Sequence, residues 1–421
     1  MVSRPDWKET KTMTWNIAKK EIISNLVSYK FFIVILLMVI LVVTSFYIMH
    51  RDFKERLSDY HLIKPGPEDS IAVNPPSPLS IFVKGLDEAM ARSYEVTRIG
   101  IDVKAGKQSG NIIFSYFSAP DFMYLTRVIL SLVALLFGFD QISREREKGT
   151  LKLMLSNPVS RAKVLIGKWI GNFLCLAVPF ILVTLIGFAF MNLDPGVSFG
   201  SFGLVRFGLI LLVSLIYISL FLSLGMLISA FTKRTAASIV ILLFIWAIVV
   251  FIIPNLGTLV ARQIVEVPSV RGLSEKRDQI WTREILLGMQ DRNWSDHFNR
   301  ISQENNMLEE DYRNKFNRLV RLSKNINRIS PVASYIYAVS DIAGTGIGEE
   351  GNLKREVIRY KNQIFPDVIA QKENYPAFTY KYRSLSQIFV GGALFDTAWL
   401  LFFNIFLFAL SYVALVRYDV R

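Results

Sequence analysis

Cysteine and histidine are scarce in this sequence of 421 residues, which contains one cysteine, Cys175, and three histidines. A single cysteine cannot form a disulfide within one chain, so any domain outside the cell must be stabilised by packing alone. His50, His61 and His297 are scattered, and nothing around them has the spacing of metal ligands. We therefore expect no metal site and no cofactor on this chain.

Motifs for nucleotide binding and catalysis are also missing. The sequence has no G-x-x-x-x-G-K-[ST] loop, so this chain cannot hold ATP phosphates in that manner. It has no convincing Ser/His/Asp or Cys/His arrangement, and we expect no catalytic residues. If ATP drives this protein, a second polypeptide must hydrolyse it.

Apolar residues are abundant instead. Hydrophobic residues make up 52% of the chain and the mean hydropathy is +0.36, which predicts an integral membrane protein rather than a soluble one. The formal net charge of +13 would suit nucleic acid binding. However, much of the excess lies in short loops between apolar runs, so topology explains the charge better and we expect no nucleic acid partner.

Several apolar runs are long enough to cross a bilayer, which takes about 20 residues. We place six spans at 31–49, 121–139, 169–191, 206–231, 238–261 and 389–416. The loops 140–168 and 232–237 and the tail 417–421 are basic, whereas the outer loop 192–205 has no lysine or arginine. The positive-inside rule then puts both termini of this multi-pass protein in the cytoplasm. The membrane we expect is the cytoplasmic (inner) membrane of a prokaryote.

Two long polar segments, 50–120 and 262–388, fall on the outer side in this topology. The first helix is expected to continue outward over 51–62. Periodicity and turn signals predict further helices at 79–91, 273–290, 304–329, 330–343 and 354–364, and strands at 99–103 and 111–117 around a glycine-rich turn, 106–110. The fold class is therefore an all-α polytopic membrane protein with six transmembrane helices, plus an α+β, mostly helical extracytoplasmic domain built from two inserts.

The amino-terminal segment 1–30 is expected to hold an amphipathic helix over residues 13–30. Trp15, Ile22 and Leu26 recur at helical spacing on its apolar side, which would lie in the membrane interface against lipid. The alternative is a plain extension of the first span. A second amphipathic helix, 304–329, has a basic face, for which we favour a solvated surface over a lipid-head-group surface.

The basic loop 140–168 alternates helical pieces and breaks. Residues 142–148 form a charged helical piece, which Gly149 interrupts before a short apolar piece containing Leu151, Leu153 and Leu155. A second break falls at Asn157-Pro158, since the residue before a proline is pushed out of the α region. Ser160 can then cap the helix that leads into the next span.

This loop resembles the signature loop of ABC-2-type transporter permeases, the membrane subunits of ATP-binding-cassette exporters. The resemblance implies that the loop is a coupling helix region that docks on a separate ATPase subunit. The residues assigned to this coupling are Arg144, Glu145, Arg146, Glu147, Gly149, Thr150, Leu151, Leu155, Pro158 and Arg161. It further implies a homodimer of this chain with two copies of the ATPase subunit, which would bind the ATP and magnesium. The large outer inserts resemble those of a subgroup of the family.

Glu145 and Glu147 are two positions apart and therefore point about 200° apart on a helix. Both face one partner only if the helix lies in a cleft, so we expect Glu147 to form an ion pair with the ATPase. Gly149-Thr150 would turn the chain so that Leu151, Leu153 and Leu155 return toward the membrane.

Three polar residues within the spans are candidates for the transport path. Asp396 is an intramembrane carboxylate near the outer end of the sixth span, where such groups usually face protein or water. The alternative is an interfacial carboxylate that reaches the lipid head groups. Ser131 and Ser238 lie in the second and fifth spans, which the resemblance predicts to line the interface between two copies, with Gly138 allowing close approach.

The sequence thus favours a permease subunit that couples ATP hydrolysis by a separate subunit to export or extraction of a substrate. One alternative is a secondary transporter or channel, which would need ionisable groups or broken helices at the midplane, with Pro179 and Pro254 as candidate breaks. Another is a membrane-anchored assembly or signalling protein whose exterior domain binds an envelope partner. The sequence does not select the substrate.

Overall fold

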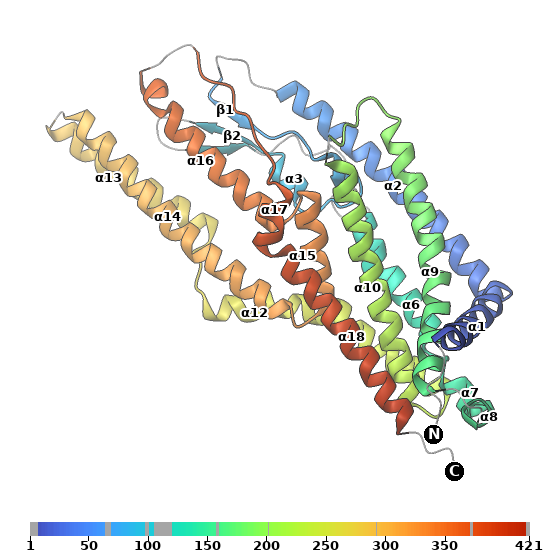
Figure 1. Cartoon of the computed structure of the whole chain (residues 1–421). Helices are drawn as coiled ribbons and strands as arrows, with labels where there is room; N and C mark the ends of the chain where they lie inside the picture. The colour runs from blue at the N-terminus through green and yellow to red at the C-terminus, as the bar shows by residue number, and fades with distance from the viewer. Residues whose placement is uncertain are drawn as a thin grey trace.

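The computed structural model describes residues 7–63, 69–96, 101–104, 120–156, 160–200, 202–291, 293–370 and 374–417. It is mostly helical, with long helices lying side by side at one end and a smaller domain of helices and short strands at the other (Figure 1). The two termini lie at the end away from the smaller domain.

Within the described residues, the helices include six that are long and apolar enough to cross a membrane. The chain is therefore a multi-pass membrane protein, as its hydropathy predicted. The six candidate spans are Tyr29–Ile63 (α2), Phe122–Glu147 (α5, η2, α6 and α7), Arg161–Asn192 (α9), Gly203–Phe231 (α10), Thr235–Ile264 (α11, η3 and α12) and Leu385–Val416 (α17, η4 and α18).

The amino-terminal helix α1, Trp7–Leu26, is separate from the first span. A turn at Val27-Ser28 divides it from α2, so the alternative of a plain extension is wrong. Helix α1 packs along α9 at Gly171, where an added Cβ would lie 2.8 Å from the carbonyl oxygen of Ala18. Glycine is needed here because only a residue without a side chain lets the two backbones approach this closely.

Helix α10 is central among the spans and packs against α6, α15 (Pro331–Ala343) and α18 (Leu394–Val416). Its contact with α6, Ser131–Gly138, depends on a pair of glycines. A Cβ on Gly138 would lie 2.8 Å from the carbonyl oxygen of Leu222 and 2.9 Å from the Cα of Gly225. The close approach that Gly138 was expected to allow between copies is thus used within the chain.

The fifth span continues as a helix through Pro254, one of the two candidate breaks. Helix α11, Thr235–Ala247, passes through a π-helical segment, η3 (Ile248–Ile252), into α12, Ile253–Ile264. Pro254 has no N–H to donate to the preceding turn. The Val249 carbonyl of that turn accepts from the Ser330 hydroxyl. Figure 1 shows α12 turning away from the direction of α10 and α18. Helix α9 also runs through Pro179 without a break.

The two inserts share one domain. A three-stranded antiparallel sheet of order β1-β2-β3 comes from the first insert, as Ile71–Val73, Ser93–Val96 and Ile101–Lys104. Helix α16, Ile347–Ile369, comes from the second insert and packs against β2. Their common core consists of Ala72, Met90, Tyr94, Val96, Leu353, Val357, Tyr360, Ile364 and Val368.

The helix predicted over 79–91 is wrong. The structure has a 3-10 turn, η1 (Pro78–Ile81), and a short helix, α3 (Asp87–Met90). Between them Gly85 adopts a φ of +49°, which interrupts the helix, and a Cβ there would lie 2.5 Å from the carbonyl oxygen of Thr345. The strand expected at 99–103 is present as β3. The other strand and the glycine-rich turn, 106–117, lie outside the described residues.

The second insert contains a long helical hairpin, α13 (Val270–Asp291) and α14 (Trp294–Asn327), followed by α15, Pro331–Ala343. All three agree with predicted helices, and Gly344 ends α15 in the left-handed region with a φ of +75°. The position of α15 was not predicted. It packs between α10 and α18 as part of the core of the spans, and the Ser330 hydroxyl donates to the Val249 carbonyl within span 5.

Candidate functional site: the loop between the second and third spans

The predicted pattern of helix, break and helix is confirmed in this loop. Helix α7, Ser143–Glu147, is followed by Gly149 with a φ of +74° and by α8, Thr150–Ser156. The Ser160 hydroxyl accepts the Lys163 N–H and caps α9 as expected. Figure 1 shows α7 and α8 at the end of the molecule opposite to the inserts.

Glu145 points into the protein rather than away from it. The Lys168 ammonium donates to Glu145 Oε1 at 2.7 Å and to Glu21 Oε1 at 2.8 Å. The Lys168 side chain is 3% exposed, so both carboxylates pair with a buried cation. A buried cation without a partner is costly, which makes this cluster an anchor between α1, α7 and α9.

Arg146 and Glu147 hold the short turn between the fourth and fifth spans. The Arg146 guanidinium donates to the carbonyls of Thr232 and Ala230, both at 2.9 Å, at the carboxyl end of α10. Glu147 Oε2 accepts from the Thr235 N–H at 3.2 Å and from its hydroxyl at 2.8 Å, at the amino end of α11. A carboxylate is favourable at that end of a helix because of the helix dipole.

The two glutamates therefore point apart, as their spacing predicted, and each has a partner within the chain. Arg161 adds a further internal contact, since its guanidinium donates to the Leu415 carbonyl at 2.8 Å near the end of α18. The loop is thus held against α9, α10, α11 and α18.

The rest of the loop divides into a buried and an exposed side. Leu151 is buried, but Leu153 is 71% exposed and does not pack against the spans as Leu151 does. The expected return of Leu153 toward the membrane stays a prediction. Leu151 and Leu153 are two positions apart on α8 and therefore point about 200° apart, so they cannot both face the spans. Arg144 and Thr150 are also exposed. The side chain of Leu155 and all of Pro158 lie outside the described residues.

A family model described as ABC-2 family transporter protein matches residues 15–420. The chain belongs to this family. It resembles the probable ABC transporter permease protein NosY of Pseudomonas aeruginosa, with 32% identity over 187 residues, 42% of this chain and 65% of that protein. The NosY protein of Stutzerimonas stutzeri is 29% identical over 171 residues, 39% of this chain and 60% of that protein. The chain thus spans less than two thirds of either relative.

Asp396 of this ABC-2 permease is fully buried, and its carboxylate accepts two hydrogen bonds from the Arg328 guanidinium. Arg328 Nε lies 2.5 Å from Asp396 Oδ1 and Nη2 lies 2.9 Å from Oδ2. Lys324 Nζ is 3.7 Å from the same carboxylate. The alternative in which Asp396 reaches the head groups is therefore wrong. Beside this pair Gly392 has a φ of +126°, which interrupts the helix geometry of span 6.

Ser131 and Ser238 join the second and fifth spans of the permease to each other within one chain. The Trp246 indole donates to the Ser131 hydroxyl at 2.9 Å, and the Ser238 hydroxyl donates to the Phe139 carbonyl at 2.7 Å. Both serines are fully buried. Their assignment to a transport path, like that of Asp396, stays a prediction.

The residues predicted at the membrane interface lie on α1. Trp15 is 55% and Leu26 44% exposed, whereas Ile22 packs against the core of the spans. Trp15 and Leu26 are placed to contact lipid, and Ile22 packs α1 against the rest of the permease.

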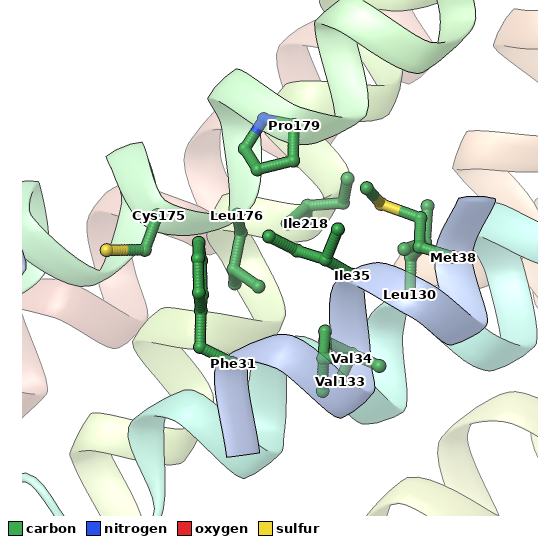
Figure 2. Close-up of a pocket in the computed structure, with 10 residues that line it drawn as sticks. All are labelled: Phe31, Val34, Ile35, Met38, Leu130, Val133, Cys175, Leu176, Pro179 and Ile218. Carbon is green, nitrogen blue, oxygen red and sulfur yellow. The ribbon is translucent and has the colours of Figure 1, made fainter. Parts of the chain in front are cut away.

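A small pocket lies among the first four spans and has no charged group (Figure 2). Its lining is Phe31, Val34, Ile35, Met38, Leu130, Val133, Cys175, Leu176, Pro179 and Ile218. Such a lining offers no group that would hold an ion or a phosphate. No cluster of three metal-ligating side chains occurs in the part of the chain that the structure describes.

Sequence reasoning missed the partners of the charged residues. Lys168 was counted as a basic residue of the loop and, with Gly167, as part of the family resemblance, and Arg328 only as part of a basic helix face. The signal was available for Asp396, because a carboxylate within a span requires a cation nearby. Its partner could not be chosen among the many basic residues without the position of α15.

Proposed function

We propose that this permease is the membrane subunit of an ATP-driven exporter and that α7, Gly149 and α8 dock on a separate ATPase subunit. Two copies of the chain would assemble with two ATPase subunits, which supply the ATP and magnesium sites. The basic loops and both termini face the cytoplasm in this proposal, and the inserts face outward. The two relatives are probable ABC transporter permease proteins, which supports this assignment.

One observation carries the proposal. Glu145, Arg146 and Glu147 contact α9, α10 and α11, whereas Arg144, Thr150 and Leu153 are exposed and form the outer surface of the loop. Leu153 with basic residues around it can supply an apolar centre and a polar rim to a contact with a partner protein. Movement of that surface would reach several spans at once through the internal contacts.

The experiment is Leu153→Asp with Leu62→Asp as matched control. Leu62 is 77% exposed and lies on the end of α2, on the side of the inserts. A charge at the centre of an apolar contact should cost at least about 2 kcal/mol of binding, or roughly 30-fold in affinity. A surface leucine outside the interface should tolerate the change.

We expect the ATPase subunit to co-purify with wild-type protein and with Leu62→Asp, but not with Leu153→Asp. The abundance of the permease in the membrane should be equal in all three. Normal ATPase capture by Leu153→Asp would rule out this docking surface. Failure of wild-type protein to bind any cassette ATPase would contradict the proposed function itself.

The second copy is proposed to contact the second and fifth spans. Support comes from span 5, where Val240 is 66% and Phe244 68% exposed within one chain. Single cysteines at these positions, in a Cys175→Ala background, should crosslink two copies. The absence of a crosslink at any exposed position of either span would count against this interface.

A further inference from the structure

Helix α1 is joined to the loop side of the second span by polar contacts that repeat one helical turn apart. The first contact is the one already described, in which Lys168 of α9 pairs with Glu21 and Glu145. The second is centred on Asn172, whose Oδ1 accepts from Asn25 Nδ2 at 2.9 Å and from Gln141 Nε2 at 3.1 Å.

The two contacts follow each other in the same order on all three segments. Residues 21 and 25 of α1 and residues 168 and 172 of α9 are each four positions apart, which places each pair on one face of its helix. Gln141 lies in the turn before α7, four positions ahead of Glu145. The Asn172 amide also donates to the Lys168 carbonyl at 2.8 Å, so the two contacts are linked to each other. We call these six side chains the α1 ladder.

The ladder lies beside a tight helix contact. A Cβ on Gly167 would lie 3.0 Å from the Thr14 carbonyl oxygen, and one on Gly171 would lie 2.7 Å from the Glu21 Cβ. Glycines four positions apart give one helix a flat side on which another can pack. Sliding of α1 along α9 would therefore break both polar contacts and drive side chains into this surface.

Burial makes the ladder stiff. Lys168, Asn172 and Gln141 are buried, and the side chain of Glu21 is 11% exposed. Polar groups that lose their partners in such a place cannot exchange them for water, so each contact resists separation. An ordinary surface helix at the membrane interface needs no such contacts.

We infer that α1 belongs to the coupling unit: it moves with α7 as one rigid body, and Lys168 and Asn172 are the positioning residues that join them. This inference rests on the proposed function, since α7 moves only if an ATPase docks on it. Helix α1 then carries the motion of the loop to the membrane interface, where Trp15 and Leu26 are exposed.

The first test needs no change in the ladder. Spin labels are placed at Lys19→Cys on α1 and Ser156→Cys on α8, both exposed, in a Cys175→Ala background. A second pair, Lys19→Cys and Leu62→Cys, reports movement against the side of the inserts. The distances are measured in the complex with the ATPase, free of nucleotide and trapped with ATP and vanadate.

We expect the distance between α1 and α8 to be the same in both states, while the reference distance changes. A change between α1 and α8 in the wild-type ladder would overturn the inference. If the reference distance also stays the same, α1 does not carry the motion, and the inference fails as well.

The second test cuts only the contacts that reach α1. Glu21→Met with Asn25→Leu removes both, and the loop keeps its own bonds from Glu145 and Gln141 to α9. The matched control is Lys20→Gln with Ser24→Ala, the same spacing on the exposed face of α1. The first variant should lower the permease-stimulated ATP hydrolysis to the rate of the ATPase alone, and should broaden the α1–α8 distances.

The control should keep wild-type stimulation and wild-type distances. If the cut variant binds the ATPase and retains full stimulation, the ladder has no part in coupling, whereas the docking proposal stands. If no ATPase binds even the wild-type chain, the proposed function has failed, and the inference with it. Should the cut variant be absent from the membrane, the distances in wild-type protein still decide the question.

Discussion

The pair of Asp396 and Arg328 gives a quantitative prediction about how the inserts are fastened to the spans. The Asp396→Leu variant would leave the guanidinium of Arg328, which is 18% exposed, without its two-armed partner. Lys324 would also lose a carboxylate, although Asp341 lies 3.6 Å from its ammonium. Breaking a buried pair from one side costs about 3–5 kcal/mol, and we expect a loss in stability in that range.

Removing the cation instead should cost less. In the Arg328→Met variant Asp396 keeps Lys324 at 3.7 Å, so the carboxylate is not left alone. We expect the free energy of unfolding to fall by about 2–3 kcal/mol. This lies between the cost of losing a charged hydrogen bond and the cost of breaking a buried ion pair. The double variant, Asp396→Leu with Arg328→Met, should be within about 1 kcal/mol of wild type, because no unpaired charge is buried.

The assay is reversible unfolding of the purified permease by sodium dodecyl sulfate in mixed micelles, with hydrogen exchange to locate the loss. The α15 amides should exchange faster in both single variants, since α15 follows Arg328 directly and packs on α18. If the stability loss of the double variant equals the sum of the two single losses within about 0.5 kcal/mol, the two groups are not coupled and this reasoning is refuted.

Other predictions use single positions. Gly138→Val should destabilise the permease by about 1–3 kcal/mol, measured by the same unfolding assay, since its Cβ would meet the α10 backbone. Gly149→Ala should cost about 1–2 kcal/mol from its φ of +74° alone, because nothing lies within 4 Å of the added Cβ, and Gly149→Asn should cost less. Arg146→Gln should speed hydrogen exchange at residues 230–235, where the guanidinium holds two carbonyls. The hydrogen bond from His297 lowers the pKa of Glu284. This contact therefore stabilises the α13–α14 hairpin fully above about pH 4.3, and the stabilisation is lost as pH falls through the lowered pKa. Hydrogen exchange across the hairpin should rise in acid, and Glu284→Gln should remove this pH dependence.

The six spans were predictable because each apolar run is long, and hydropathy over about 20 residues is a strong signal. The break at Gly149 and the cap at Ser160 were predictable for another reason. They depend on residues close in the sequence, where glycine and serine have specific roles at helix ends.

The position of α15 was not predictable from its sequence. Its Pro331 start and its serines at 334 and 340 make it less apolar than a span, so it looked like part of the outer domain. It is buried because Tyr335 meets Tyr217 and Ser214 of α10, partners more than 100 positions away. The inward contacts of Glu145, Arg146 and Glu147 escaped prediction for the same reason, since periodicity reports one face and not what lies against it.

The shared core of the two inserts has a consequence for the biosynthesis of this protein. Val96 of β2 packs in the same core as Leu353 of α16, and about 250 residues of chain separate them. At about 5–20 residues per second, a ribosome needs roughly 10–50 s to cover that distance. In the proposed topology, the first insert has then already been translocated, its apolar residues have no covering helix, and four further spans are still to be inserted. A nascent chain in this condition exposes the apolar surface that holdase chaperones bind, and proteases have their best access to it before α16 emerges.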